Sequence, residues 1–562
     1  MREVNFRLPP PEATGWLDAR EAPGDEFDFV IVGGGSSGSV VASRLSEEPD
    51  TSVALLEAGN AGNSWLVTTP AAGIFMVPTS LNNWAFETVP QPGLNGRRGY
   101  QPRGRVLGGS SAINAMVYTR GNRWDYDHWA SLGCAGWSFD GVLPYFKKAE
   151  RNEEFGEPWH GREGPLPVSR SRTDNPFHKT FLEAARQAQF PLCDDFNVPE
   201  PEGLGIYQLT QRNGERWSAA RAYLHPHIGM RRNLYVACRA RVLRILFDGT
   251  RAIGIEYAQG RRRRSLRVRR EVILSAGALQ SPQILMLSGV GDAGELQRFG
   301  IPVVTHLPGV GRNLQDHPDF IFGYKARSLD LLGISLRGFG RLAREARRYV
   351  TERRGMLTTN FAEAGGFLKT RQDLDIPDIQ LHFVVAMVDD HARRLHWGHG
   401  FSCHVCLLRP RSRGTVKLQS SDPMAVPAID PNFFGAPEDL EHMVVGFKIT
   451  RRLLDAPVLA TQRTVDCFTA DVRSDDEIRA ILRARVDTVY HPVGTCRMGS
   501  DEASVVDPEL RVRGVSGLRV ADCSIMPTLV GGNTNAPAIM IGEKAAAMIK
   551  ANVYEDPGVV VS

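Results

Sequence analysis

The sequence has no long uninterrupted apolar run, although 42% of its 562 residues are hydrophobic. No window approaches the roughly 20 apolar residues that a membrane-spanning helix needs. The first residues, MREVNFRLPPPEATGWLDAR, carry prolines and acidic side chains where a signal peptide requires an apolar core. These absences predict a cytoplasmic protein with no transmembrane segment, and residues 1–26 are expected to form an N-terminal arm outside the fold.

An excess of charge of one sign is also missing, because the formal net charge is only +4. No overall field therefore drives the chain onto nucleic acid, although a peripheral contact with a membrane stays open. The one basic run, from Arg261 to Arg270, lies between strand-like stretches at 252–257 and 271–275. It is typical of a solvated hairpin loop, with an anion-binding patch as the alternative.

The eight cysteines do not form a disulfide framework, since they are scattered and most lie in apolar sequence. A reducing compartment is the expected setting. Cys403, His404 and Cys406 resemble metal ligands superficially, but no second pair follows at a matching spacing. The alternation in FSCHVCLL favours a strand, and no metal site is predicted.

The chain is too long for one ordinary core, and its first folding unit begins near residue 27. Phe27 to Val32 is a nearly all-apolar run, as in a strand buried on both faces of a parallel sheet. A glycine cluster, a helical pattern from Ser39 and a second buried strand over 52–56 follow it. This order predicts a βαβ unit of about 30 residues.

Residues 33–38, GGGSSG, supply a GxGxxG pattern between that strand and the helix. Gly33 permits a tight turn, Gly35 lets the backbone approach a pyrophosphate, and Gly38 allows the helix to pack closely on the strand. The N-terminus of the helix offers free N–H groups to the anion. Glu57, about 20 residues further on, is placed to hold the hydroxyls of a ribose. The unit therefore predicts dinucleotide binding without deciding between FAD and NAD.

A second glycine-rich segment, GRVLGGSSAIN at 104–114, favours an extended cofactor. This segment and GALQSPQILMLSGVG at 277–291 resemble the two signatures of the glucose–methanol–choline (GMC) oxidoreductases. The C-terminal stretch from HPVGT at 491–495 to NTNAP at 533–537 is similar to that family as well. Within the family, the chain most resembles the bacterial choline dehydrogenase and alcohol dehydrogenase branch.

The resemblance implies an α/β fold in which a Rossmann-like FAD-binding domain carries an inserted α+β substrate-binding domain. The FAD-binding domain is expected to be discontinuous, over 27–154, 233–316 and 486–555. Residues 155–232 and 317–485 are expected to form the substrate-binding domain. Strand-like stretches at 272–276 and 518–521 fit this division, because one sheet can collect them only if the chain leaves it and returns.

FAD is the cofactor that the resemblance implies. Some members of the family attach FAD through a histidine just before the asparagine that aligns with Asn114. Ile113 stands at that position, which predicts noncovalent FAD. The resemblance places the contacts with FAD at Gly33, Gly35, Ser37, Gly38, Glu57, Val106, Gly109, Asn114, Met116, Val242, Asp522, Thr534 and Asn535.

The family's catalytic pair, a histidine with a second histidine or an asparagine, falls on His491 and Asn533. Asn535 is the rival for the second role. A neutral imidazole at His491 would take the hydroxyl proton of an alcohol while the α-carbon delivers hydride to flavin N5. The carboxamide of Asn533 would donate a hydrogen bond to the same oxygen and so orient the substrate.

The predicted reaction is oxidation of a primary alcohol to the aldehyde, with O2, a quinone or another carrier as the electron acceptor. Choline is an alternative substrate, although no cluster of acids suggests a site for a quaternary ammonium. A cyanohydrin lyase of the same fold and a nicotinamide-dependent enzyme also stay open. His396 and His399 in the loop HWGHG are the expected contact with substrate, and the remaining histidines, His317 included, are expected to be structural or pocket-lining. The candidate pocket walls are Phe75, Phe361, Phe383, Val385, Met387 and Trp397.

Overall fold

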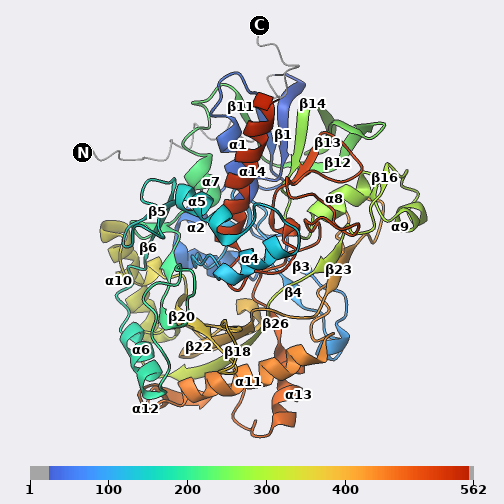
Figure 1. The fold of residues 1–562 in the computed structure, drawn as a ribbon. Coiled ribbons are helices and arrows are strands. Elements are labelled where there is room, and N and C mark those ends of the chain that lie inside the picture. The colour runs from blue at the N-terminus through green and yellow to red at the C-terminus, as the bar shows by residue number, and fades with distance from the viewer. Residues whose placement is uncertain (1–23, 556–562) are drawn as a thin grey trace.

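The computed structural model describes residues 24–555, in which two large sheets lie one above the other (Figure 1). Seven strands form the upper sheet. β1 pairs in parallel with both of its neighbours, and Val30 lies opposite Ala54 on one side and Val272 on the other. In order of pairing, the strands are β11 (Leu234–Ala237), β2 (Val53–Leu56), β1 (Glu26–Val32), β14 (Arg262–Leu274), β13 (Arg251–Gln259) and β12 (Ala240–Asp248), with β27 (Leu518–Val520) beside β14.

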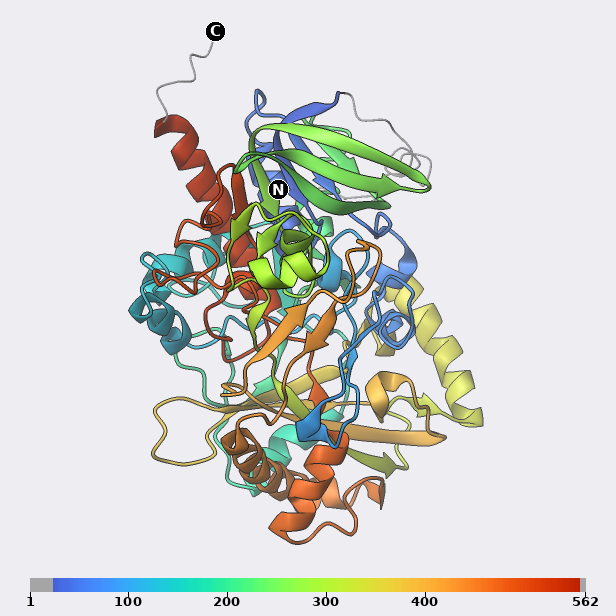
Figure 2. The ribbon, with the colours of Figure 1, turned by 90° about the vertical axis from the view of Figure 1, so that its right-hand side faces the viewer.

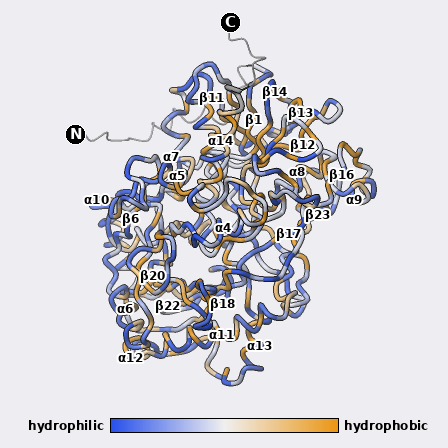
Figure 3. Tube along the Cα trace, in the orientation of Figure 1, coloured by the Kyte–Doolittle hydropathy of each residue, from blue (hydrophilic) through white to orange (hydrophobic). Residues whose placement is uncertain are grey.

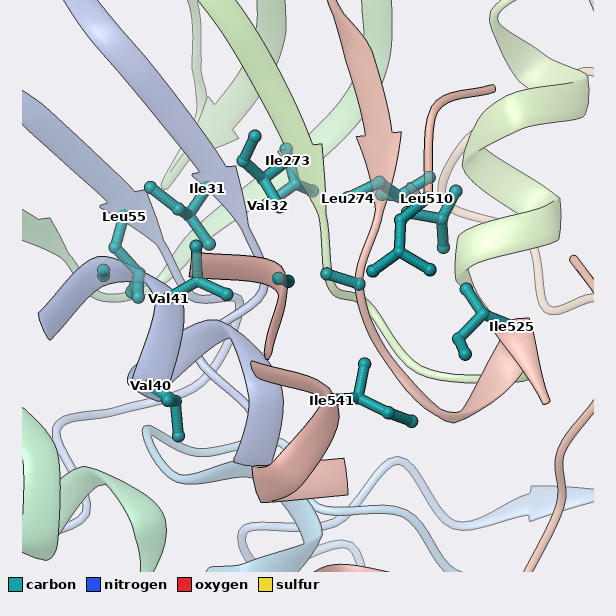
Figure 4. Packing of buried hydrophobic residues seen from close by; sticks show 14 of the residues in the cluster. Ile31, Val32, Val40, Val41, Leu55, Ile273, Leu274, Leu510, Ile525 and Ile541 are labelled. Atoms are coloured by element: carbon teal, nitrogen blue, oxygen red, sulfur yellow. The ribbon is translucent and has the colours of Figure 1, made fainter. Parts of the chain in front are cut away.

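Helices from opposite ends of the described chain pack together on this sheet. α1 (Ser36–Leu45) contacts α14 (Asn535–Glu555), and Arg44 forms a 2.7 Å ion pair with Glu543. α14 also packs against α5 (Phe139–Ala149). Figure 4 shows Ile31 and Leu55 of the strands close to Val41 of α1. Burial of these apolar side chains on the face of the sheet is the main force that holds this half together.

Eight strands form the lower sheet. α11 (Pro437–Leu454) and α6 (Phe177–Gln187) pack against its strands, while α13 (Asp475–Arg485) and α12 (Pro457–Ala460) pack against these two helices (Figure 1). In order of pairing, the strands are β25 (Arg463–Asp466), β18 (Pro318–Ala326), β22 (Gly398–Leu407), β21 (Ile379–Val384), β20 (Ala362–Leu368) and β7 (Gly203–Ile206). β19 (Gly333–Ile334) pairs with β22, and β26 (Asp487–Thr488) pairs with β18.

Shorter elements join the two sheets and cover their edges. The helices are α2 (Trp65–Thr68), α3 (Gly73–Met76), α4 (Arg123–Ser131), α7 (Ala219–Tyr223), α8 (Ser281–Leu287), α9 (Ala293–Arg298) and the longer α10 (Leu336–Glu352). The strands are β3 (Phe86–Glu87), β4 (Tyr100–Gln101), β5 (Glu150–Asn152), β6 (Leu166–Arg170), β8 (Gln208–Leu209), β9 (Gln211–Arg212), β10 (Glu215–Arg216), β15 (Val290–Gly291), β16 (Thr305–His306), β17 (Arg312–Leu314), β23 (Gly414–Lys417) and β24 (Ala428–Asp430). The 3-10 turns are η2 (Pro70–Ala72), η3 (Pro92–Leu94), η4 (Gly109–Ala112), η5 (Met356–Thr358), η6 (Asp390–Ala392) and η7 (Cys523–Ile525). Figure 3 shows that apolar residues concentrate on the strands of the upper sheet.

Most of the basic run lies in a strand, and so does the segment around Cys403. The basic run forms part of a hairpin, as expected, but most of it lies within β14 rather than in the loop. The strand accommodates these arginines because Arg262 and Arg263 are exposed, while Arg267 and Arg269 alternate with the buried Leu266 and Val268. Arg263 also lies 3.5 Å from Glu256 on β13. The segment around Cys403 is a strand, β22, as predicted, and the described residues contain no group of three side chains that could hold a metal ion.

The two sheets draw on chain segments close to the predicted domain division, with two departures. α7, within 155–232, packs against α1 of the upper half, while β26, just beyond residue 485, joins the lower sheet. The division itself stays a proposal. Most of the predicted N-terminal arm lies outside the described residues, and β1 already begins at Glu26. Over residues 24–555, no helix combines the length and the apolar character needed to cross a bilayer.

Candidate active site

A first cavity lies at the carboxyl ends of β1 and β2, beside the glycine-rich turn. Three glycines in or beside this turn, Gly33, Gly38 and Gly109, leave no room for a side chain. Gly33 has a φ of +98°, and a Cβ at Gly38 would lie 2.0 Å from the Gly33 carbonyl oxygen. A Cβ at Gly109, where φ is +55°, would lie 2.7 Å from the Cα of Gly35. Of the predicted cofactor contacts, this cavity is lined by Gly33, Gly35, Ser37, Glu57, Gly109, Val242 and Asp522.

Glu57 is fixed at the end of β2 by backbone donors. The Gly34 N–H donates to its Oε2 at 3.0 Å, and the Gly59 N–H donates to its Oε1 at 2.7 Å. Burial raises the pKa of this carboxyl to about 7, against the effect of the two N–H groups. The carboxylate therefore faces the cavity in one orientation, as the recognition of ribose hydroxyls requires.

A second cavity adjoins the first. Of the predicted site residues, it is lined by Asn114, Met116, His491, Asn533, Thr534 and Asn535. The side chains or backbones that line both cavities are Ser36, Arg103, Ser110, Cys523 and Ala538. Because these residues are shared, one extended molecule can occupy both spaces. Gly38 and Val106 line neither cavity, since Gly38 packs under the turn and Val106 lies in a small apolar cluster.

His491 is buried between a second histidine and an asparagine. Its Nδ1 lies 3.0 Å from Nδ1 of His317, and its Nε2 lies 3.2 Å from Nδ2 of Asn533. Nε2 of His317 lies 3.0 Å from the carbonyl oxygen of Leu408, which can only accept. His317 therefore carries its proton on Nε2 and accepts from His491 Nδ1–H. This assignment leaves the lone pair of His491 on Nε2, at the wall of the second cavity.

Asp316 holds the two histidines in register. Its Oδ1 accepts from the backbone N–H of His317 at 2.8 Å and from that of His491 at 2.9 Å, while Oδ2 accepts from the Thr488 hydroxyl at 2.5 Å. Tyr490, which lies between Thr488 and His491 in the chain, has a φ of +74°. The strain of this turn is offset by these hydrogen bonds.

Asn533 is oriented by donors that bind its carbonyl. The Thr119 hydroxyl lies 3.2 Å from Oδ1, and Nε2 of Gln380 lies 3.0 Å from it. Both groups donate, so the NH2 end of Asn533 points to His491. Asn535 instead accepts from the Ser36 hydroxyl at 2.7 Å, beside the glycine-rich turn. The geometry thus pairs His491 with Asn533 rather than with Asn535.

The imidazole of His491 is neutral in this setting. Burial lowers its pKa well below the usual 6.5, with further lowering by His317, His382 and Arg103. Burial likewise lowers the pKa values of His317 and His382 to about 3. A neutral imidazole with a fixed tautomer, whose Nε2 lone pair lies at the cavity wall beside Asn533 Nδ2, can accept a proton from a molecule in the cavity.

The second cavity is mostly apolar, and its charged residues are all basic. Arg103, Arg216 and Arg394 line it, whereas no aspartate or glutamate of the described residues does. Arg216 is buried without a carboxylate partner among those residues and donates to the carbonyl and Oδ1 of Asn114 at 2.5 and 2.9 Å. Burial lowers the pKa of its guanidinium to about 9. A cationic molecule would gain no ion pair in this cavity.

The loop HWGHG was expected to contact substrate, but its histidines do not line the cavity. His396 pairs with Asp389 at 2.9 Å, and His399 bonds Ser335 and the Leu331 carbonyl. The adjacent Arg394 and Leu395 line the cavity instead. Of the candidate wall residues, Phe361 and Met387 line it, Phe383 and Val385 belong to the core of the lower half, and Phe75 and Trp397 are exposed.

His317 is the main residue whose role the sequence did not reveal. It was expected to be structural or pocket-lining, yet it bonds the candidate base directly. It stands 174 residues from His491 in the chain, so no local pattern joins the two. The polar segment LQDHP around it, next to a buried strand, was the available signal.

The arrangement of a glycine-rich dinucleotide turn and a buried histidine beside an adjoining cavity is that of a cofactor-dependent oxidoreductase. Residues 27–319 and 410–542 match the N-terminal and C-terminal parts of GMC oxidoreductase, and the chain belongs to this family of FAD-dependent enzymes that act on CH–OH donors.

Two curated relatives and one solved structure illustrate the similarity. The chain is 45% identical to an alcohol dehydrogenase (acceptor) of Pseudomonas putida, over 93% of this chain and 95% of the relative. It is 44% identical to the mitochondrial choline dehydrogenase of Mus musculus, over 96% and 92%. The crystal structure of pyridoxine 4-oxidase from Mesorbium loti superposes with a TM-score of 0.84 at 31% identity, over 93% of this chain and 99% of that one.

Proposed function

We propose that the protein oxidises a neutral primary alcohol to the aldehyde with noncovalently bound FAD, using His491 as the base and Asn533 as the hydrogen-bond donor. The observation that carries this proposal is the approach of His491 Nε2 to Asn533 Nδ2, 3.2 Å apart at the wall of one cavity. An alcohol oxygen placed against both nitrogens would find an acceptor for its proton and a donor for its lone pair.

The chain's own residues account for the movement of the proton. His491 Nε2 takes the hydroxyl proton, and the alkoxide character that develops on oxygen favours departure of hydride from the α-carbon. The Asn533 amide donates to this oxygen and stabilises its partial negative charge. His317 Nδ1 accepts from the imidazolium that forms, a charge-assisted hydrogen bond that is stronger than the neutral one. The product is the aldehyde.

The first cavity fits the adenosine half of FAD and the second fits its flavin end beside the substrate. Glu57 would hold the ribose, and the glycine-rich turn would hold the pyrophosphate, where a Cβ at Gly38 or Gly109 would collide with backbone. When bound, FAD supplies the acceptor for the hydride. Ile113 lines the second cavity and has no nucleophilic atom, which supports noncovalent attachment. Denaturation with acid should therefore release FAD into the supernatant.

The lining of the second cavity favours a neutral alcohol over choline. A quaternary ammonium is stabilised by carboxylates or by several aromatic faces. Among residues 24–555, the lining of this cavity holds three arginines, no carboxylate, and only Phe361 and Tyr490 as aromatic side chains other than histidines. We expect kcat/KM for an uncharged aliphatic or aryl primary alcohol to exceed that for choline by more than tenfold, which is about 1.4 kcal/mol of transition-state stabilisation.

Anaerobic reduction of the bound flavin tests this function directly. Bleaching of the yellow enzyme by a panel of primary alcohols, but not by choline, is expected, and readmission of air then tells O2 from another acceptor. His491→Ala should abolish the bleaching while retaining the flavin spectrum. A cyanohydrin lyase would cleave its substrate without bleaching, and equal bleaching by choline would contradict the argument from charge.

A further inference from the structure

α10 presents a basic and partly apolar face to solvent. Residues 336–354 contain seven arginines and two glutamates. Glu345 and Tyr349 are buried against the protein, whereas Leu336 and Val350 are 82% and 71% exposed. Leu336, Ala343 and Val350 are spaced by seven residues and share one outward stripe, and Ala343 is exposed as well. Figure 2 shows α10 along one edge of the molecule.

Two arginines on the outer side of α10 have no carboxylate neighbour. Arg341 pairs with Asp330 at 2.8 Å and Arg348 pairs with Asp174 at 3.1 Å, so those charges are partly neutralised. Within the part of the chain that the structure describes, Arg344 and Arg347 form no ion pair, and both are exposed. Their guanidinium groups are available to an external anion.

Large apolar side chains from two other segments surround this helix. Trp65 of α2 and Phe75 of α3 are 64% and 56% exposed, and η5, which follows α10, packs against η2 between those two helices. On the other side, Trp397 is 62% exposed and forms a bridge with Ile334, two residues before α10 begins. Isolated exposed apolar residues are ordinary, but a group gathered around a basic helix marks an interaction surface.

The lining of the second cavity adjoins the same surface. Ile74 of α3 and the pair Arg394 and Leu395 line the cavity, and Leu395 is itself 69% exposed. These residues are chain neighbours of Phe75 and Trp397. The exposed apolar group therefore adjoins the lining of the cavity.

We propose that the surface formed by α10, Trp65, Phe75, Leu395 and Trp397 docks on a bilayer that contains anionic lipid. Exposed apolar side chains on a helix with free arginines suit the boundary between headgroups and acyl chains, where the arginines meet lipid phosphates. In this orientation the part of the second cavity lined by Ile74, Arg394 and Leu395 lies next to the membrane, and an apolar alcohol or a lipid-soluble electron acceptor reaches it without crossing water. The docking is independent of the reaction proposed above.

Co-sedimentation of the FAD-loaded enzyme with vesicles tests the proposal. Binding is expected to vesicles of phosphatidylcholine with phosphatidylglycerol, and to be weaker with phosphatidylcholine alone and at high salt. Arg344→Gln with Arg347→Gln should lower the partition coefficient by roughly 25-fold, since each arginine near an anionic surface contributes about fivefold. The matched control is Arg261→Gln with Arg262→Gln, which removes two exposed arginines from the hairpin of β13 and β14 and should leave binding unchanged.

The apolar contribution is tested separately. Leu336→Ser with Val350→Ser should weaken vesicle binding at every salt concentration while leaving the melting temperature and flavin reduction by alcohol unchanged, because both side chains contact solvent. Absence of binding to the anionic vesicles, or an equal effect of the control pair, would overturn the proposal. A third result would also overturn it: the lipid-free enzyme sediments as a dimer, and the Leu336→Ser and Val350→Ser changes dissociate that dimer. This result would assign the surface to a second copy of the chain.

Discussion

Replacement of His317 offers the sharpest test of the proposed base. The structure makes His317 the acceptor for His491 Nδ1–H, at 3.0 Å, and Leu408 fixes its tautomer. His317→Gln keeps a donor, the NH2 group of the glutamine, near the Leu408 carbonyl but removes the acceptor at the δ position. His317→Asn keeps the acceptor for His491, because its Oδ1 lies close to the place of the missing Nδ1, but it loses the donor to the Leu408 carbonyl.

The expected loss of rate in His317→Gln follows from the hydrogen bond that the substitution removes. Without an acceptor, the buried N–H of His491 is left unpaired at a cost of about 1–3 kcal/mol, or the imidazole adopts the other tautomer, in which Nε2 carries the proton and cannot accept another. A loss of that size in transition-state stabilisation lowers the rate by about 10- to 100-fold. We therefore expect His317→Gln to be slowed by this factor and His317→Asn to stay within severalfold of the unchanged enzyme.

Anaerobic stopped-flow measurement separates this positioning effect from a general disturbance. The limiting rate of flavin reduction should fall in His317→Gln, while the apparent Kd for the alcohol and the melting temperature change little. If the glutamine and asparagine variants reduce flavin equally fast, the tautomer argument is wrong. A rise in Kd with an unchanged limiting rate would also refute it, because it would assign His317 to substrate binding.

Three further predictions rest on the same site. Asn533→Ala should lower the limiting rate of flavin reduction by about 100-fold or more, as expected for loss of one oxyanion donor. Asn535→Ala should mainly weaken retention of FAD. If Asn535→Ala instead causes the larger loss of rate, Asn535 is the second catalytic residue. Gly38→Ala should purify with little bound FAD, measured by the flavin absorbance per protein, because the added Cβ would lie 2.0 Å from the carbonyl oxygen of Gly33; full flavin content would contradict the collision. The acid limb of the pH profile of kcat/KM should lie below pH 6.5. Burial lowers the pKa of His491, so its neutral form persists as the pH falls below the usual histidine pKa of 6.5. An inflection near pH 7 would show that another group limits the reaction.

The parts of the fold encoded by local patterns could be predicted from the sequence. The βαβ unit of β1, α1 and β2 follows from two apolar runs and a glycine turn that lie within about 30 residues. Strand β22 could be read from the alternation around Cys403, since side-chain alternation is a property of a single strand.

Contacts between distant segments were accessible only where a family motif marked them. His491 and Asn533 were placed together through the resemblance, but His317 was not, because its role depends on the pairing of β18 with β26 and on Asp316. The HWGHG loop was misread for a related reason. Its histidines are turned to Asp389 and Ser335, and only the path of the chain after η6 places Arg394 and Leu395 at the cavity.

The contact between α1 and α14 has a consequence for how the enzyme is made. Ser36 bonds Asn535, and the Ser37 hydroxyl donates to the Ala538 carbonyl at 2.7 Å, so one wall of the nucleotide turn is supplied by residues translated some 500 positions later. While a ribosome is still synthesising the segments between them, the glycine turn stands beside unpaired apolar surface on α1 and β1. We therefore expect the flavin to insert only after α14 has docked, and conditions that delay this docking during synthesis should raise the yield of cofactor-free protein.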